Sequence, residues 1–349
     1  MLNATMIFNS IGSRALAAAA LATVMLLLAE RPAAAQPEIF PTDLPWTVQP
    51  QFGLDAAARS SISGATCNTN EAGPRRNCLV VFEDAKYAQF FQINPFTIRP
   101  GATINLVPDA PNLGRFRNLG AEAAGFDAGF FYVVNSRVPR ILPPLPGEAF
   151  DPSFLVSRFA VDARGLPVFQ LPGTPVSPQV QVSKKLQEAI AAGIPVGGFP
   201  PQVLDRTRAE VEGLAVKDGV MYFGFRGPPV NGQTLILSAS VQSMFGAGPL
   251  NSAQHLVALG PRIGIRDMAR VTGGILILAG PIADQVGPAT VFRWNEVTNE
   301  LRDLGLLVAP SNRKAESLIV LDEDPEFYTI LVMYDDIANG GPTQYNIPL

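Results

Sequence analysis

The sequence predicts an all-β protein folded as a β-propeller of five or six blades, with a short helical insertion around residues 183–192. The first observation is a unit that occurs four times. In each unit an acidic residue opens a short apolar segment, and a tight turn then leads into a second, more hydrophobic run. The second observation is composition, because 31 Gly and 32 Pro with only 16% charged residues suit many short strands joined by turns. A repeated strand–turn–strand unit is typical of a repeat architecture.

The four units begin at Glu122, Glu212, Asp267 and Glu316. In the clearest unit, residues 212–216 form one strand, Lys217-Asp218-Gly219 form the turn, and residues 220–225 form the return strand. An Asp-Gly pair between two apolar runs is a strong hairpin signal. The return strands are apolar at nearly every position, which indicates sheets buried on both faces. Blades packed face to face around an axis meet this requirement.

A weaker fifth unit begins at Ser63, with Cys78-Leu-Val-Val-Phe as its return strand. We expect further strands at residues 88–93, 154–161, 234–240 and 289–294. The interval of 90 residues after Glu122 is too long for one blade of ~40–50 residues, so the chain forms either five blades with an insertion or six with one degenerate. We also expect the stretch before residue 60 to supply an outer strand that closes the ring against the C-terminal segment.

Residues 1–35 are typical of a secretory signal peptide. Arg14 precedes an apolar run from Ala15 to Leu28, and Ala33-Ala34-Ala35 supplies the small residues of a cleavage site before Gln36. The run is too short to span a bilayer, which needs ~20 residues, and no later stretch approaches that length. We therefore expect residues 36–349 to form a single propeller domain in the periplasm or outside the cell.

Charge and cysteine content narrow the class of protein further. Without residues 1–35 the chain carries 24 basic and 29 acidic residues, a balance that offers no surface for nucleic acid or anionic lipid. We expect a monomer. Cys67 and Cys78 are the two cysteines, eleven positions apart, and in an oxidising compartment they most simply form a disulfide. The alternative is a catalytic or metal-binding thiol.

Several segments resemble an uncharacterised bacterial family, domain of unknown function 3616. They are Cys-Leu-Val-Val (78–81), Glu-Gly-Leu-Ala (212–215), Arg-Gly-Pro (226–228), Gly-Ile-Arg-Asp (264–267), Leu-Ala-Gly-Pro (278–281) and Lys-Ala-Glu-Ser-Leu (314–318). The resemblance extends over roughly residues 61–336 and implies a propeller-like fold without implying an activity. More loosely, the Glu-Gly hairpins are similar to those of esterase-like phytase and gluconolactonase-type propellers.

The strand directions place many charged residues on one rim of the ring. If each acidic residue starts an innermost strand, the return strand ends on the same rim. This rim then combines Glu122, Glu212, Asp267 and Glu316 with Arg208, Arg226, Arg266, Lys314, Glu83, Asp84, Asn135, Ser136, Arg137, Asp335 and Asp336. We expect a pocket for a small molecule or ion here, with Glu122, Glu212, Asp267, Glu316, Arg226, Arg266 and Lys314 as its binding residues.

Several interpretations of such a rim are open. The carboxylates either bind a ligand, or hold an ion, or only form structural ion pairs with Arg226, Arg266 and Lys314. Oxygen ligands suit a hard cation such as Ca²⁺, which Glu212, Asp267 and Glu316 are placed to hold. A bound Ca²⁺ also makes a hydrolase of esters, lactones or phosphates an alternative. The single histidine, His255, and the lack of a Gly-x-Ser-x-Gly segment argue against zinc and Ser-His-Asp chemistry.

Overall fold

The computed structural model describes residues 36–71, 76–106, 119–136, 153–167, 180–192, 209–229, 232–283, 285–310 and 313–349. Residues Pro37–Leu349 form one compact unit. The expected signal peptide, residues 1–35, lies outside the described residues, as do Arg137 and Arg208 of the expected rim. Among the described residues, none of the helices is long and apolar enough to cross a membrane.

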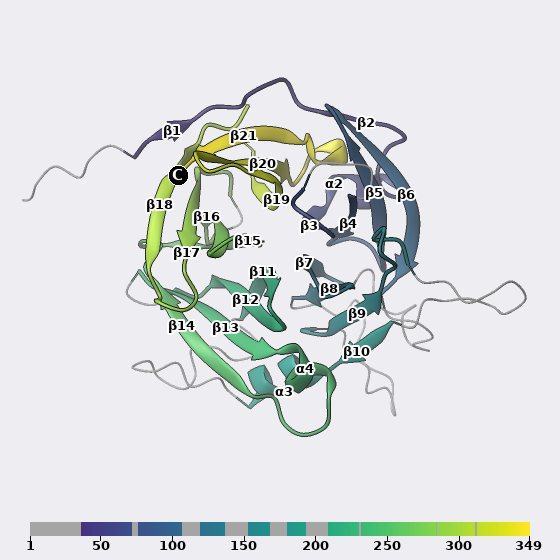
Figure 1. The fold of residues 1–349 in the computed structure, drawn as a ribbon, viewed down its shortest axis with the longest axis vertical. Helices are drawn as coiled ribbons and strands as arrows, with labels where there is room; N and C mark the ends of the chain where they lie inside the picture. Colours follow the sequence, from purple (N-terminus) through teal and green to yellow (C-terminus); the bar gives the residue numbers. More distant parts are fainter. Residues whose placement is uncertain are drawn as a thin grey trace, which may run out of the picture. The chain divides into compact units, whose positions relative to one another are not determined.

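The described strands form five sheets arranged as the blades of a propeller, so the predicted fold is confirmed with five blades (Figure 1). Blade 1 contains β3 (Ile62–Cys67), β4 (Asn77–Phe82), β5 (Tyr87–Asn94) and β6 (Thr97–Asn105). Blade 2 contains β7 (Ala121–Asp127), β8 (Phe130–Asn135), β9 (Val156–Ala160) and β10 (Gln181–Ser183). Blade 3 contains β11 (Glu210–Lys217), β12 (Val220–Gly227), β13 (Thr234–Ser240) and β14 (Ser252–Val257).

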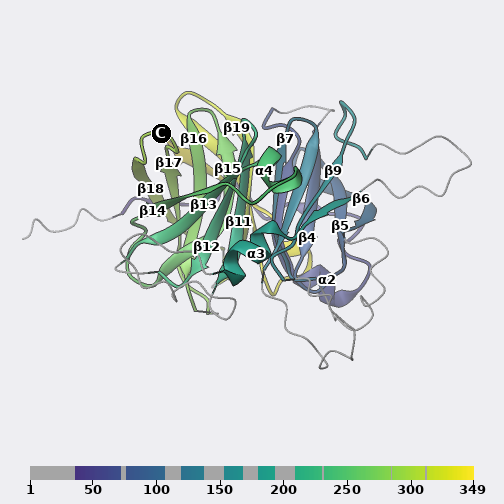
Figure 2. The same ribbon diagram turned by 90° about the horizontal axis from the view of Figure 1, so that it is seen from below.

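Blade 4 contains β15 (Ile263–Val271), β16 (Gly274–Pro281), β17 (Ala289–Trp294) and β18 (Leu301–Leu307). Blade 5 has three strands, β19 (Ala315–Glu323), β20 (Phe327–Tyr334) and β21 (Thr343–Pro348). The innermost strands β3, β7, β11, β15 and β19 contact one another in that order, and β19 returns to β3. Figure 2 shows the strands running between the two rims of the ring.

Five hydrophobic clusters fill the five spaces between neighbouring blades. Strand β4 shows why the return strands are apolar throughout. Its Leu79 and Val81 pack toward blade 2, whereas Val80 and Phe82 pack toward blade 5. Each face of the sheet is therefore a core face, as the uninterrupted apolar runs predict.

The N-terminal segment closes the ring by a different route from the one expected. β1 (Glu38–Ile39) pairs in parallel with β18 of blade 4, and β2 (Thr47–Val48) pairs in parallel with β6 of blade 1. Between them the chain passes over blade 5, where Pro41 forms a single bridge with Tyr345. The segment thus joins blades 4 and 1 across blade 5 (Figure 1), instead of completing blade 5 with a regular fourth strand.

Short helices lie at the edges of this ring. α2 (Ala56–Ser60) begins at Asp55, whose side chain accepts a hydrogen bond from the Ala58 amide, and η2 (Ala338–Gly340) contacts it. The predicted helical insertion is α3 (Lys185–Ala191), whose Leu186 and Ile190 enter the core between blades 2 and 3. α4 (Val241–Phe245) lies beside it at the outside of the ring (Figure 1).

Candidate functional site

A β-bulge near the start of each innermost strand supplies the central residues of the site. Near its start, each of these five strands has one residue that the pairing register skips. These residues are Ser63, Glu122, Glu212, Arg266 and Glu316; further shifts lie at Leu321 in β19 and at Arg226 in β12. A bulged residue has no partner in the neighbouring strand, so its side chain is re-aimed. The rim on which these residues lie is called here the acidic rim.

The residue after two of these bulges is a glycine because the innermost strands crowd together there. A Cβ on Gly64 would lie 2.5 Å from the carbonyl oxygen of Glu122 in the next blade. A Cβ on Gly213 would lie 2.8 Å from side-chain atoms of Ile265 and Met268. The Ser-Gly and Glu-Gly pairs of the sequence therefore reflect the close approach of neighbouring blades.

In blade 4 the structure corrects the expected residue by one position. Asp267 was expected beside Glu122, Glu212 and Glu316, but Arg266 occupies the bulge. The Asp267 side chain is fully buried, and its two oxygens accept hydrogen bonds from the amides of Met268 and Leu318, both at 2.8 Å. It thereby joins blade 4 to blade 5, away from the cavity. Burial raises its pKa well above the ordinary value.

The acidic rim encloses a cavity of about 380 Å³, called here the axial cavity. Eight acidic and two basic side chains line it, together with serines. The lining residues are Ser60, Ser61, Ser63, Glu83, Asp84, Glu122, Ser136, Glu210, Glu212, Arg226, Lys314, Glu316, Asp335 and Asp336. Of the expected binding residues, Glu122, Glu212, Glu316, Arg226 and Lys314 are therefore brought together, whereas Arg266 and Asp267 do not reach the surface of the cavity.

Both basic residues of the cavity wall are paired with carboxylates. Arg226 Nε lies 3.0 Å from Glu210 Oε2, and Arg226 Nη1 lies 3.4 Å from Glu212 Oε1. Lys314 Nζ lies 2.7 Å from Asp335 Oδ2 and 3.3 Å from Glu316 Oε1. Glu210 is a member of this site that the sequence analysis missed. Its place two residues before Glu212 on the same strand was the signal available.

Arg266 forms a buried pair behind the cavity wall. Its side chain is 1% exposed, and Nη1 lies 2.8 Å from Glu316 Oε1. Nη2 donates to the carbonyl oxygens of Pro281 and Ala283. Arg266 is thus engaged entirely by protein acceptors, and it does not offer a group to a ligand.

Glu122 differs from the central carboxylates Glu212 and Glu316, because it takes part in no ion pair within the described residues. Its Oε2 accepts a hydrogen bond of 2.6 Å from the Ser63 hydroxyl. Burial, and then the neighbouring Glu212 and Glu83, raise the pKa of Glu122 well above its ordinary value. Burial likewise raises the pKa of Glu83, which also faces Asp335.

Glu212 and Glu316 also have raised pKa values in spite of their basic neighbours. Burial raises the pKa of Glu212 to about 8, although Arg226 opposes the change. Burial also raises the pKa of Glu316, opposed by Arg266 and Lys314. Glu316 Oε2 is buried and has no hydrogen-bond partner within the described residues. The wall therefore holds more carboxyl groups than its two basic side chains can neutralise. The raised pKa values favour the protonated form of these carboxyl groups.

The expected Ca²⁺ ligands do not form a joint set. Both oxygens of Asp267 are used by backbone amides, which leaves Glu212 and Glu316 from the three residues proposed. Within the described parts of the chain, no three His, Cys, Asp or Glu side chains converge as ligands of one metal ion. The residues present therefore do not fit the Ca²⁺ site that the sequence suggested.

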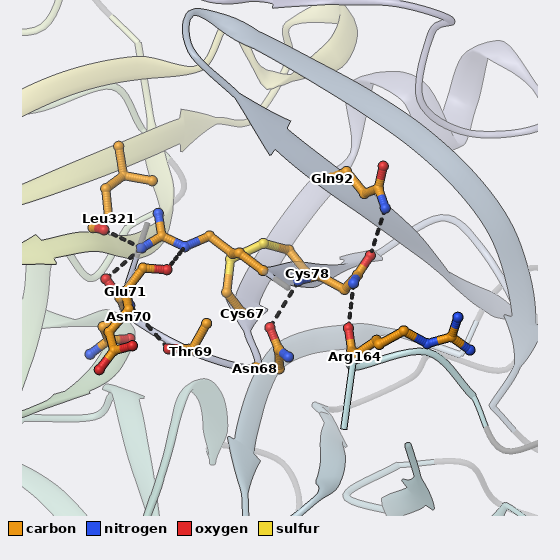
Figure 3. The surroundings of a disulfide bond; sticks show 11 residues. Cys67, Asn68, Thr69, Asn70, Glu71, Cys78, Gln92, Arg164 and Leu321 are labelled. Atoms are coloured by element: carbon orange, nitrogen blue, oxygen red, sulfur yellow. Dashed lines mark hydrogen bonds between the residues drawn. A yellow bond between two sulfur atoms is a disulfide. The ribbon is translucent and has the colours of Figure 1, made fainter. Parts of the chain in front are cut away.

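The far rim, opposite the acidic rim, is braced by the disulfide that the sequence predicted. Cys67 and Cys78 are direct partners across β3 and β4 and form a disulfide (Figure 3). The loop between them reaches other blades. Arg76 donates to the carbonyl of Leu321, Asn77 donates to the carbonyl of Arg164, and Asn70 donates to Arg270 and Glu323. Both thiols are thus consumed in a structural role.

His255 lies in the space between blades 3 and 4, away from the axial cavity. Its Nε2 is 2.9 Å from the Ser238 hydroxyl, and its ring packs against Tyr222 and Trp294. Burial lowers its pKa. These contacts describe a packing residue.

Comparisons with solved structures give matches of low sequence identity. An exo-β-1,3-galactanase from Phanerochaete chrysosporium is 9% identical, with a TM-score of 0.47. The match covers 88% of this chain and 64% of the galactanase chain. A GH43 β-1,3-galactosidase is 11% identical, with a TM-score of 0.48 and coverage of 88% and 94%. The periplasmic gluconolactonase of Pseudomonas aeruginosa is 16% identical, with a TM-score of 0.35 and coverage of 78% and 65%.

The chain thus spans less than two thirds of the length of the galactanase and of the gluconolactonase. No curated protein sequence matches the chain. One protein family matches part of the chain, over blades 3, 4 and 5. This span is shorter than residues 61–336, over which the sequence suggested a resemblance. The suggested resemblance is confirmed there, since residues 207–344 match the family described as Protein of unknown function (DUF3616).

Proposed function

We propose that this protein is an exported, monomeric binding module that takes a small, positively charged ligand or ion in the axial cavity. The observation that carries the proposal is the composition of the cavity wall, eight carboxylic acids against two cations in about 380 Å³. Ligand pockets are commonly ~300–1,000 Å³ in volume, so the cavity is large enough for a small molecule. Export rests on the signal-peptide pattern of residues 1–35.

The cavity disfavours an anionic ligand. Arg226 and Lys314, the two basic residues of the wall, each pair with two carboxylates. An anion would have to displace these carboxylates and would meet the remaining negative charge of the wall. For the same reason we do not propose a hydrolase of phosphate esters, lactones or other esters, in which Arg226, Arg266 or Lys314 would hold an anionic substrate.

A bound cation would offset part of the free energy that it costs to bury carboxylates in the cavity wall. Buried charges cost free energy unless they are paired, and the buried Glu122 takes part in no ion pair within the described residues. A bound cation supplies the missing positive charge. The protein with its ligand is therefore expected to be more stable than the protein alone.

Thermal unfolding with a panel of ligands tests this function. The panel contains Ca²⁺, Mg²⁺, aliphatic amines and the anions gluconate and phosphate. We expect at least one cation to raise the Tm, and the anions to leave it unchanged. A substitution of Glu212→Gln is expected to weaken the effect, because Glu212 lines the cavity. Glu326→Gln is the matched control, since it removes one carboxylate from the exposed turn after β19.

Two outcomes would contradict the proposal. One is a panel in which no cation stabilises the protein. The other is a cation whose effect is equally large in Glu212→Gln and in wild type, because such a cation would bind elsewhere.

A further inference from the structure

The acceptors of the axial cavity are distributed around the axis. Blade 1 contributes Glu83, blade 2 contributes Glu122, blade 3 contributes Glu212, and blade 5 contributes Glu316 and Asp335. The acidic groups thus surround the cavity from four blades of the ring. A single point charge satisfies acceptors that converge on it, whereas distributed acceptors are better matched by a ligand with several separated donors.

A second observation points to an absent donor. Glu316 is 97% buried and lines the cavity, yet its Oε2 has no hydrogen-bond partner within the described residues. Its other oxygen already meets Arg266 and Lys314. A buried acceptor without a donor costs free energy, so a ligand group that donates a hydrogen bond to Oε2 would stabilise the site.

In blade 2, Glu122 receives a hydrogen bond from Ser63 and takes part in no ion pair within the described residues. Glu122 therefore has no cationic partner there, and Glu316 of blade 5 has one oxygen without a donor. Since Glu122 and Glu316 belong to different blades, a ligand must present its donors at more than one point.

We propose that the ligand of the axial cavity is an aliphatic diamine or polyamine, whose separated ammonium groups meet carboxylates of different blades. This inference rests on the proposed function, since it specifies the cation that the cavity takes. An ammonium group offers three N–H donors and one positive charge, which is the complement of a wall rich in acceptors. The methylene chain between the ammonium groups allows them to reach separate walls.

Ligand binding in this cavity is coupled to proton release. Burial raises the pKa of Glu212 to about 8, so this carboxyl group holds a proton near neutral pH, and burial also raises the pKa values of Glu83, Glu122 and Glu316. Ammonium groups that meet these carboxylates displace the protons. The affinity for the diamine therefore increases with pH, by up to about tenfold per pH unit for each proton released.

Isothermal titration calorimetry of the whole protein tests the inference. The probes are 1,4-diaminobutane, spermidine, butylamine and Ca²⁺, each at about pH 6 and about pH 8. We expect 1,4-diaminobutane or spermidine to bind at least about tenfold more tightly than butylamine, and more tightly at the higher pH. Buffers of different ionisation enthalpy measure the protons released.

Two substitutions locate the binding. Glu122→Gln keeps an acceptor for Ser63 but removes the charge, and is expected to weaken diamine binding by about tenfold or more. Glu83→Gln, at a less deeply buried position, serves the same purpose if Glu122→Gln does not fold. Glu326→Gln is expected to bind like wild type.

The outcomes separate this inference from the proposed function. If Ca²⁺ binds at a site sensitive to Glu122→Gln while the diamines do not bind, the cation site stands and the diamine inference is overturned. Equal affinity for butylamine and 1,4-diaminobutane also overturns it. If no cation binds, the inference and the proposed function both fail.

Discussion

Removing the disulfide on the far rim is expected to cost the protein about 3 kcal/mol of stability. The perturbation is the replacement of both Cys67 and Cys78 by alanine. The two cysteines are direct neighbours across β3 and β4, and both are buried in the core between blades 1 and 5. They close a loop with a sequence separation of 11. In the chain-entropy description, a loop of this length restricts the unfolded chain by about 3 kcal/mol at 25 °C.

The corresponding change in Tm follows from the size of the folded unit. Unfolding entropy is ~2.1 cal/mol/K per residue, which gives roughly 0.66 kcal/mol/K for the unit Pro37–Leu349. A loss of about 3 kcal/mol therefore lowers the Tm by about 5 °C. Thermal unfolding followed by circular dichroism measures it, and urea unfolding supplies the free energy.

Two controls separate the cross-link from the contacts of its loop. Reduction of wild type with dithiothreitol is expected to reproduce the shift and to leave the alanine variant unchanged. Asn70→Ala keeps the disulfide but removes the hydrogen bonds to Arg270 and Glu323, and is expected to cost about 1 kcal/mol. A loss below about 1 kcal/mol in the double alanine variant would refute the entropic reasoning.

Three further predictions concern the axis of the propeller. Arg266→Met is expected to destabilise the protein by about 3–5 kcal/mol, because the buried Glu316 carboxylate loses one of its two cationic partners. Adding Glu316→Gln to this variant is expected to restore part of the lost stability, as measured by urea unfolding. Burial raises the pKa of Glu122, so the folded state retains a proton that the unfolded state loses above the ordinary value of 4.5. The Tm is therefore expected to fall as the pH rises above about 5, by at most roughly 2 °C per pH unit from this group, with a smaller slope in Glu122→Gln. Gly264→Ala is expected to lower the stability by about 3 kcal/mol or more, since its Cβ would lie 1.9 Å from the backbone oxygen of Arg226 in blade 3. Gly101→Ala is the control: its Cβ would meet only an ordinary contact of 3.4 Å, so urea unfolding is expected to show little change.

The hairpins could be predicted because their signals are local. In the turn between β11 and β12, Asp218 and Gly219 both adopt positive φ, 52° and 76°, which is the conformation that an Asp-Gly pair favours. The closure of the ring could not be predicted in the same way. β1 and β2 have two residues each, too few for a periodic pattern, and they pair with two different blades.

The position of the site was predictable because strand direction alone decides which rim each residue joins. The identity of one central residue was not. A β-bulge adds one residue to one strand, and the hydrophobic pattern does not reveal where this addition lies. In blade 4 the sequence Arg266-Asp267 offered two charged residues at the bulge, and the acidic one was expected. The structure places Arg266 there, and Asp267 accepts hydrogen bonds from the amide of Met268 in its own strand and the amide of Leu318 in blade 5.

This one-residue difference changes what the ring of central residues can do. With an acidic residue in all four units, the axis would resemble a site for a hard cation. With Arg266 in blade 4, Glu316 becomes part of an ion pair, which accounts for one of its two carboxyl oxygens. Structural pairing does not account for Glu122, which is buried beside further carboxylates and takes part in no ion pair within the described residues. A carboxyl group kept in such surroundings lowers the stability of the fold, and the cationic ligand that we propose would offset this cost.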